Sequence, residues 1–531
     1  MASTPPKPAR TGLNKIQPPK GTRDMYPEDA LKRRYLEQSW RDASVRCGFE
    51  EIHGPTFETT DLYAVKSGEG ILGELFQAYS GKSPEEVEQV RATGRAPFAM
   101  RPEFTPTLAR MFASRAGALP RPCKWFTGGP YFRAERPQRG RLREFLQWNV
   151  DFVGDDGTSQ GRATADVEIL GVAITLLRDL GLNQQDTVVA YSDRRMAEAV
   201  LRHIGATDDT LATWFAWIDS IPKNPQAAVG RANEMGLSKA EVQFVIGYFF
   251  NNKADARVLA ALDENPNNVP AFIKFQNSVL QVPEVADSIA QLQRSSRIVE
   301  ETGLGGWSAQ HNAVVRGLAY YTGLVFEVLA DGERAVAGGG RYDRLIELMG
   351  GPPTPAVGFA MGDVVVSLLL EDKGLMPQGA ELMEAVSRRP ASVRPEVFVV
   401  GADDDASDAD VRRLSADLRR GVEADAHRQA GETKPWSAGR YESASGGVRP
   451  MHARVSYKST RNLKKLLADG EKQFARLAAV VHGPDRVQLK DFDARRDLTP
   501  ADVGLSESHA EFSVDPASPV YVGRAAGRVL G

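Results

Sequence analysis

Residues 131–154, YFRAERPQRGRLREFLQWNVDFVG, constrain the fold more than any other stretch of this 531-residue chain. They predict two β-strands joined by a loop at 136–141, because the second segment alternates apolar and polar side chains with period two. The apolar face of that strand carries four large side chains: Leu146, Trp148, Val150 and Phe152. The opposite face carries Gln147, Asn149 and Asp151, and Arg133 and Glu135 are expected on one face of the first strand. The stretch therefore predicts a β-hairpin with one polar and charged face.

The polar face of this hairpin has two interpretations. Such a face either meets water, as in an ordinary amphipathic hairpin at the surface, or lines a binding site. The loop at 136–141 favours the second, because Arg136, Arg139 and Arg141 gather there beside further arginines. Clustered guanidinium groups repel one another unless an anion lies among them. We therefore predict an anionic ligand at this loop.

Length and composition limit the class of protein. A single hydrophobic core stops growing at roughly 250 to 300 residues, so this length predicts two or three domains. Charged residues make up 25% of the chain and hydrophobic residues 42%, which is typical of a globular protein. The formal net charge of −3 is no global nucleic-acid signature, so a polyanion would have to bind local basic patches. No apolar run reaches the ~20 residues of a membrane span.

The two cysteines, Cys47 and Cys123, are too few for a disulfide framework and lack the spacing of a zinc site. We therefore expect a reducing, cytoplasmic setting. The seven histidines form no HxxH or HxxxH pair, so no structural metal is predicted. Residues 1–19 are rich in proline and small polar residues, which predicts a disordered leader, with a short transit peptide as the alternative.

Two further patterns stand out before residue 193. Apolar residues recur at helical spacing from Pro27 until Gly48, which predicts a helix between them. Farther on, Arg101, Glu103 and Thr105 alternate, which predicts a short strand just before another helix. The polar face of that strand either meets water or lines a site.

The middle of the chain changes character twice. Residues 194–298 predict helices throughout, without clustered chemistry, so we expect a helical insertion whose aromatic residues form its core. Strands return at 311–330, where Arg316, Tyr320 and Tyr321 lie in a β-rich run, and the glycines at 338–340 predict a turn. Antiparallel segments that carry Arg and Tyr beside a glycine run predict a sheet that cups a small polar ligand.

The last third of the chain predicts a separate α/β unit. It follows a linker at 373–394 and covers 395–499, with a polar, Gly- and Ser-rich insertion at 427–452 and a loose tail at 500–531. Four basic residues cluster near one predicted helix start: Lys458, Arg461, Lys464 and Lys465. Such a cluster is either a solvated basic face or a contact for RNA.

These stretches together resemble the histidyl-tRNA synthetases, a family of class II aminoacyl-tRNA synthetases, over most of the chain. KGTRDMYP resembles the family's start, GFEEIHGPTFE resembles class II motif 1, and FRAERPQRGRLREFLQWNVDFVG matches motif 2. VVRGLAYYTGLVFE and AGGGRYDRLIELMGG resemble the two histidine-specific motifs.

The resemblance implies an α+β fold with a six-stranded antiparallel catalytic sheet flanked by helices. The catalytic domain would comprise residues 20–193 and 299–372, interrupted by a helical insertion domain at 194–298. The α/β unit at 395–499 would be the anticodon-binding domain. The resemblance also implies a homodimer that joins L-histidine to tRNA(His) with ATP and Mg²⁺, through a histidyl-adenylate.

The resemblance assigns ATP-binding and catalytic roles to four residues. Arg133 and Arg316 would be the catalytic cations on the α-phosphate, with Arg133 also holding the histidine carboxylate. Glu135 would accept a hydrogen bond from the adenine amino group, and Arg141 would bind the γ-phosphate. No metal site made of protein groups alone is implied.

The same resemblance implies a histidine-binding set. Glu103, Thr105 and Gln147 would bind the α-amino end, together with Arg133 and Arg316 near the carboxylate. The imidazole nitrogens would be read by three groups: Asp151, Tyr320 and Tyr321.

Three departures from the family pattern bear on the site. Ala319 replaces an acid, and Asp151 stands where a glutamate is common. In motif 3, GFAMG is normally followed closely by Glu-Arg, whose arginine packs on adenine, but Asp363 and the valines at 364–365 follow here. Plastid and cyanobacterial histidyl enzymes look similar at these positions, so we predict an active variant of that branch, with Arg344 as a substitute cation.

Two alternatives belong to other functional classes. One is a catalytically inactive paralogue, such as the regulatory subunit of ATP phosphoribosyltransferase, which generally lacks an anticodon-binding domain. The other is a module that senses uncharged tRNA, although no kinase-like segment is present to report such sensing.

Overall fold

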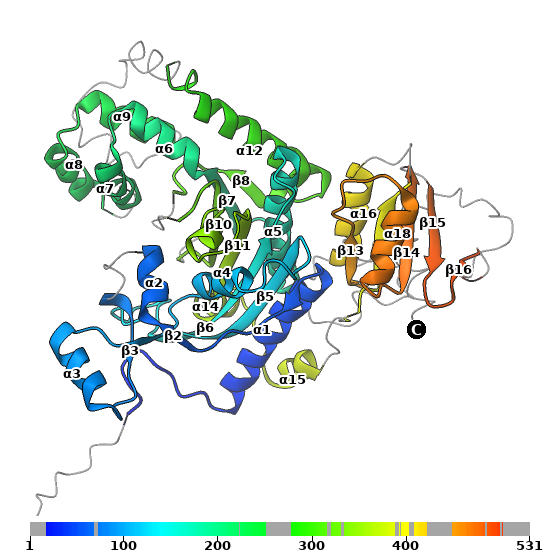
Figure 1. Ribbon diagram of the computed structural model, residues 1–531, viewed down its shortest axis with the longest axis horizontal. Coiled ribbons are helices and arrows are strands. Elements are labelled where there is room, and N and C mark those ends of the chain that lie inside the picture. Colours follow the sequence, from blue (N-terminus) through cyan, green and yellow to red (C-terminus); the bar gives the residue numbers. More distant parts are fainter. Residues whose placement is uncertain are drawn as a thin grey trace, which may run out of the picture.

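The computed structural model describes residues 17–67, 73–221, 224–250, 278–315, 320–330, 334–387, 392, 394–402, 408–421, 449–483, 486–499 and 502. A large sheet with helices on both faces forms the main body, and a smaller sheet with its own helices forms the C-terminal part (Figure 1). Most of the predicted leader, of the 427–452 insertion and of the 500–531 tail lies outside the described residues. Within the described residues, no helix is both long and apolar enough to cross a membrane.

The main sheet has eight strands in the order β1-β5-β6-β11-β10-β9-β7-β8. Their bounds in that order are Glu50–Glu51, Cys123–Phe132, Glu144–Val153, Ala356–Gly362, Ala337–Arg341, Leu324–Ala330, Thr187–Asp193 and Ser308–Gln310. The six strands from β5 to β7 pair antiparallel throughout, which confirms the predicted six-stranded antiparallel sheet. The short strands β1 and β8 add one parallel pairing at each edge.

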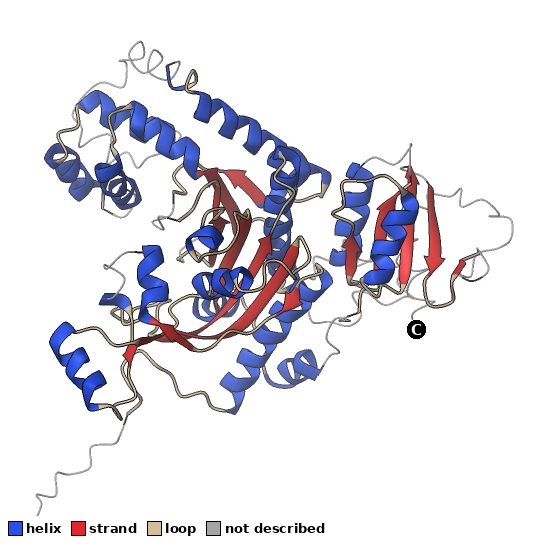
Figure 2. Ribbon diagram, viewed as in Figure 1, coloured by secondary structure: helices blue, strands red, loops and turns tan. Residues whose placement is uncertain are grey.

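The predicted hairpin is β5 and β6, which pair from Cys123 with Val153 to Phe132 with Glu144. The apolar face of β6 lies in the main core, where Trp148 stacks on Trp40 of α1 (Pro27–Arg46) with ring centroids 6.2 Å apart. Helix α5 (Ser159–Asp179) packs on the same face, which Figure 2 shows covered by long helices. The period-two prediction for this strand and the helix predicted from Pro27 are both confirmed.

The first strand of the hairpin is shorter than predicted. It ends at Phe132, so Arg133 and Glu135 lie in the connection to β6 and not on a strand face. The ladder continues by one bond, from the amide of Arg133 to the carbonyl of Arg143 at 2.9 Å. This bond keeps the start of the connection close to the sheet, over the polar face of β6.

The predicted strand through Arg101, Glu103 and Thr105 is wrong. The strand there is β4 (Phe98–Met100), which forms a small sheet with β2 (Phe57–Thr59) and β3 (Gln77–Ala78). Residues 101–104 form a loop, and Thr105 is the first residue of α4 (Thr105–Ala113), followed by a proline that suits the first helical turn. Glu103 and Thr105 therefore approach the site from a loop and a helix start.

The glycines at 338–340 do not form the predicted turn, because they lie in β10 at the centre of the sheet. A side chain at Gly339 would be only 2.3 Å from the carbonyl oxygen of Gly358 on β11, so the neighbouring strand leaves no room for one. The short helix α13 (Leu345–Leu348) and the motif 3 helix α14 (Asp363–Asp372) follow β10 and β11.

The insertion is helical where it is described. Its helices are α6 (Arg194–His203), α7 (Asp208–Ser220), α8 (Pro225–Glu234), α9 (Lys239–Phe250) and α12 (Pro283–Glu301). The aromatic residues are buried as expected of a core: Trp214, Trp217, Phe244 and Phe249.

The C-terminal sheet has the order β13-β12-β14-β15-β16. Its strands are Ala453–Val455, Val397–Gly401, Leu477–Gly483, Arg486–Asp491 and Arg496–Asp497 in that order. Helix α16 (Asp408–Arg420) packs on one face and α18 (Leu463–Lys472) on the other. The predicted C-terminal α/β unit is present, joined to the main body through a segment that includes α15 (Gly379–Ser387).

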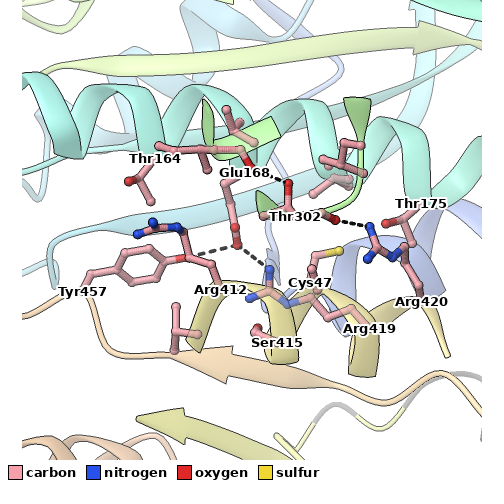
Figure 3. Close-up of a pocket in the computed structure, with 17 residues that line it drawn as sticks. Cys47, Thr164, Glu168, Thr175, Thr302, Arg412, Ser415, Arg419, Arg420 and Tyr457 are labelled. Carbon is pink, nitrogen blue, oxygen red and sulfur yellow. Dashed lines mark hydrogen bonds and ion pairs between the residues drawn. The ribbon is translucent and has the colours of Figure 1, made fainter. Parts of the chain in front are cut away.

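Glu168 of α5 lies at the junction between the two parts (Figure 3). Its carboxylate accepts hydrogen bonds from Arg419 at 2.9 Å and from the Tyr457 hydroxyl at 3.0 Å, both in the C-terminal part. It also accepts one from Lys124 of β5. A narrow pocket of about 60 Å³ runs beside these groups, between α5 and α16.

Candidate active site

A cavity of about 510 Å³ opens on the polar face of the main sheet. It lies over β6, β10 and β11, with walls from the motif 2 connection and from α7 of the insertion. Seven of the ten predicted site residues line it: Glu103, Thr105, Arg133, Arg141, Gln147, Tyr320 and Tyr321. The polar face of β6 therefore lines a cavity through Gln147 and Asn149, and ligand binding there remains a prediction.

Arg133 is held in a fixed position at the cavity. Its Nε donates to the carbonyl oxygen of Pro102 at 3.1 Å, and its guanidinium carbon lies 5.2 Å from the ring centroid of Phe145. The hydrogen bond and the cation–π contact restrict the side chain before any ligand arrives. Because Arg133 lines the cavity, the other N–H groups of its guanidinium can donate hydrogen bonds to a ligand there.

Arg141 and Glu135 form an ion pair across the motif 2 connection. Arg141 lines the cavity and its side chain is 40% exposed, whereas Glu135 is not among the lining residues. The structure thus places Glu135 on Arg141, and a contact between Glu135 and a nucleotide remains a prediction.

Gln147 brings an unsatisfied acceptor to the cavity. The residue is 6% exposed, and its Oε1 accepts no hydrogen bond from any residue that the structure describes. A buried acceptor without a donor costs about 1 to 3 kcal/mol, so a ligand that brings an N–H donor would relieve this cost. Its neighbour on the same face, Asn149, instead donates to the Tyr131 hydroxyl at 3.1 Å.

Asp151 lies behind the cavity wall and not on it. It is 3% exposed and accepts a 2.5 Å hydrogen bond from the hydroxyl of Tyr342, which does line the cavity. Burial raises the pKa of Asp151 to about 7, and the hydrogen bond from Tyr342 lowers it only in part. The structure therefore couples Asp151 to the cavity through Tyr342.

Three tyrosines form one wall of the cavity. The rings of Tyr320 and Tyr321 lie 4.6 Å apart, and Tyr320 meets Tyr342 edge to face at 6.2 Å. Tyr320 and Tyr321 precede β9, which begins at Leu324, so these two tyrosines do not lie on a strand as predicted. Arg316 and Ala319 lie outside the described residues.

Among the cavity residues that sequence reasoning did not assign, four have ionisable side chains: Asp219, Glu327, Arg334 and Tyr342. Tyr342 directly follows β10, the strand that contains the glycines at 338–340, and Glu327 of β9 pairs with Gly338. The pairing of β9 with β10 would therefore have identified both Tyr342 and Glu327 as candidate site residues. Asp219 comes from the insertion, where no local pattern indicated chemistry. Arg344, the predicted substitute cation, is exposed at the start of α13 and does not line the cavity.

Asp363, one of the residues that depart from the motif 3 pattern, makes structural contacts within the protein. It is 3% exposed, and its carboxylate accepts from the amide of Leu146 at 2.9 Å and from Arg23 at 2.5 Å. The residue therefore joins the start of α14 to the start of β6 and to the N-terminal segment. Its role in the described structure is to hold the cavity's edge.

The cavity also contains carboxylates that suit a divalent cation bound to phosphates. Three acidic residues line it, namely Glu103, Asp219 and Glu327. Mg²⁺ at a nucleotide usually takes one or two protein carboxylates, with phosphates and water as its other ligands. No cluster of three or more metal-ligating side chains occurs among the described residues, so any such ion would depend on the nucleotide.

Known proteins match this chain over its catalytic part. The family model for histidyl-tRNA synthetase matches residues 21–363. A histidine–tRNA ligase of Opitutus terrae is 36% identical over 361 residues, which is 67% of this chain and 75% of that protein. The chloroplastic/mitochondrial histidine–tRNA ligase of Arabidopsis thaliana is 32% identical over 373 residues, which is 70% of this chain and 69% of that protein.

The fold has a counterpart among solved structures. The crystal structure of histidyl-tRNA synthetase from a Nostoc species matches with a TM-score of 0.53 at 18% identity, covering 92% of this chain and 96% of that one. This likeness concerns the fold, whereas the family model and the curated relatives concern the sequence. Because the family model covers well over half of the chain and includes every cavity residue, the chain belongs to the histidyl-tRNA synthetase family.

Proposed function

We propose that this chain ligates L-histidine to tRNA(His) in the described cavity, with ATP and through a histidyl-adenylate. The assignment of the site rests on one observation: a cationic group and several hydrogen-bonding groups line the same cavity. Arg133, already held by Pro102 and Phe145, faces the same space as the unsatisfied Gln147 acceptor and the Tyr342–Asp151 pair.

The polar end of the cavity suits histidine. The substrate's α-ammonium group would donate to Gln147 Oε1 and would lie near Glu103. This hydrogen bond would satisfy the Gln147 acceptor, which has no donor among the described residues. The imidazole would contact the tyrosine wall, with Tyr342 held by Asp151. A wrong amino acid would leave these buried polar groups unpaired, and such a site can discriminate by about 10⁴.

The arginines suit the phosphates of ATP. In the first step a carboxylate oxygen of histidine forms a bond to the α-phosphorus while the bond from that phosphorus to the bridging oxygen breaks, and pyrophosphate leaves. Negative charge spreads over the phosphate oxygens, and Arg133 is positioned to neutralise it. We expect Arg316 to be the second cation there and Arg141 to bind the γ-phosphate.

Mg²⁺ would be held by the phosphates together with Glu327 or another cavity carboxylate, and it would offset charge on the leaving pyrophosphate. In the second step a ribose hydroxyl of the terminal adenosine of tRNA attacks the histidyl carbonyl carbon, and AMP leaves. The C-terminal α/β part would bind the anticodon. Its exposed basic residues at the start of α18, Lys464 and Lys465, are candidates for phosphate contacts.

Two finer assignments belong to the same proposal. We expect a homodimer, because both residues of β1 are exposed at the edge of the main sheet, where a second copy can pack. We expect a reducing, cytoplasmic compartment, because Cys47 and Cys123 are both free and buried. Light scattering on the purified chain would test the dimer, and a monomer at micromolar concentration would contradict it.

Histidine-dependent exchange between ATP and labelled pyrophosphate tests the first step, and charging of tRNA(His) tests the second. Purified protein with Mg²⁺ should show exchange that needs histidine. Absence of exchange would favour the inactive regulatory paralogue, and exchange without charging would contradict the full ligase assignment. Arg133→Ala should abolish exchange while the thermal unfolding midpoint stays within a few degrees.

A further inference from the structure

Arg334 lies in the connection between β9 and β10 and lines the candidate active site. Three arginines of the described residues line this cavity: Arg133, Arg141 and Arg334. Arg133 and Arg141 come from the connection between β5 and β6, and Arg334 comes from the connection between β9 and β10. Arg334 therefore adds a cation to the cavity from a segment that is distant in sequence from the hairpin.

Gly140 shows where the Arg334 side chain lies. The glycine has a φ of +74°, and a Cβ built on it would be 3.4 Å from Cδ of Arg334 and 3.3 Å from Cγ2 of Val365. The stem of Arg334 thus crosses the motif 2 loop at a point that the first turn of α14 also reaches. A side chain at position 140 would compete with the arginine for this space, and the left-handed backbone also favours glycine.

The charge of Arg334 is not matched by a described neighbour. Arg141 is paired with Glu135 and Arg139 with Asp372, whereas Arg334 has no ion pair or hydrogen bond with any residue that the structure describes. The guanidinium group of an arginine presents five N–H donors in one plane, and these donors fit phosphate oxygens. The planar group can also stack on aromatic rings. A free guanidinium in a cavity lined by two other arginines is suited to an anionic, aromatic ligand.

We propose that Arg334 is a nucleotide-binding residue of this site, occupying the space above Gly140 beside Val365 and contacting ATP with its guanidinium. The proposal rests on the proposed function, since ATP is the anion that the reaction requires. It replaces the earlier prediction of Arg344, whose side chain lies outside the cavity. It also accounts for the small apolar residue at 365, because Arg334 fills the space that a long side chain there would need.

The test compares Arg334→Ala with Arg344→Ala, which removes the same charge from an exposed position outside the cavity. ATP binding is measured by isothermal titration without turnover, and KM values for ATP and histidine are measured in pyrophosphate exchange. Arg334→Ala should weaken ATP binding and raise the KM for ATP by about 10- to 100-fold, as expected for one charge-assisted hydrogen bond. The KM for histidine should change less than about twofold, and Arg344→Ala should match wild type.

A second variant tests the geometry. Adding Val365→Arg to Arg334→Ala returns a guanidinium to the same point from α14, and the double variant should recover ATP affinity by about tenfold or more over Arg334→Ala. Unchanged ATP binding in Arg334→Ala overturns the proposal, whether or not the double variant folds. If wild type binds ATP but shows no histidine-dependent exchange, the proposed function fails, while the titration still decides the role of Arg334.

Discussion

Tyr342, which directly follows β10, donates a 2.5 Å hydrogen bond to Asp151 of β6 across the intervening strand β11, and the two residues are 191 positions apart in the chain. Both are buried, and only Tyr342 reaches the cavity. Burial and the adjacent Asp151 raise the pKa of the Tyr342 hydroxyl, so it keeps its proton as the donor. The bond therefore fixes which way the Tyr342 hydroxyl points before histidine binds.

Removing this bond should weaken histidine binding selectively. Tyr342→Phe deletes only the hydroxyl, and we expect the KM for histidine in pyrophosphate exchange to rise about 10- to 100-fold, as for loss of one or two buried hydrogen bonds. The KM for ATP should stay within about twofold, because the arginines are untouched. An equal rise in both KM values would contradict a role in reading the imidazole.

Asp151 should also give folding stability a pH dependence. Its pKa is raised to about 7 in the folded protein by burial, whereas a carboxyl of an unfolded chain titrates near 4. Between about pH 4 and pH 7 the folded state therefore holds a proton that the unfolded state has lost, so this residue's contribution to stability falls as the pH rises. Thermal unfolding midpoints of wild type and Asp151→Asn at pH 5 and pH 8 measure this contribution. The gain of the variant over wild type should be larger at pH 8, and parallel profiles would contradict the raised pKa.

The hairpin could be predicted in detail because one strand, β6, buries both faces. The apolar face packs on α1 and α5, the polar face lines a cavity, and period two alone separates them. The predicted strand at Arg101 failed for a related reason, because three alternating polar residues resemble a strand whether or not the backbone extends. The proline after Thr105 was the stronger signal, since it suits a helix start.

The remaining parts of the site depend on contacts between distant segments. Asp219 and Arg334 reach the cavity from α7 and from a strand connection, and neither lies in a local pattern that marks it. The glycine strand β10 was mistaken for a turn, because glycine seldom occurs in strand interiors. The close approach of Gly358 and Phe359 on β11 and of Phe326 on β9 explains why a side chain is excluded at Gly339.

Glu168 should make a large contribution to the junction between the main body and the C-terminal part. Glu168→Gln leaves Lys124 and Arg419, both less than a tenth exposed, without their shared carboxylate. Removing one partner of a buried ion pair costs about 3 kcal/mol or more. Urea unfolding should show this loss. The control Glu371→Gln removes an exposed ion pair with Lys32 and should cost less than about 1 kcal/mol.

The same residue predicts an acid-dependent loss of stability. Burial raises the pKa of Glu168, but Arg419 and Lys124 outweigh burial and lower it to about 2. Its stabilising contribution is therefore complete above about pH 4.5 and is lost as the pH falls toward 2. The difference in unfolding free energy between wild type and Glu168→Gln should shrink over that window. A difference that stays constant from pH 6 to pH 3 would contradict the lowered pKa.

Asp363 and Arg23 form an ion pair whose two members should contribute unequally. Asp363→Ala leaves the buried amide of Leu146 without its acceptor, which costs about 1 to 3 kcal/mol, and it also loses Arg23. Arg23→Ala removes a side chain that is 33% exposed and leaves the amide bond to Asp363 intact, so it should cost less than about 1 kcal/mol. Urea unfolding of both variants measures the costs, and limited proteolysis reports release of the N-terminal segment. Both variants should release that segment, but only Asp363→Ala should also lower the midpoint of unfolding clearly. Equal costs would mean that the ion pair, and not the bond to Leu146, connects α14 to the edge of the active site.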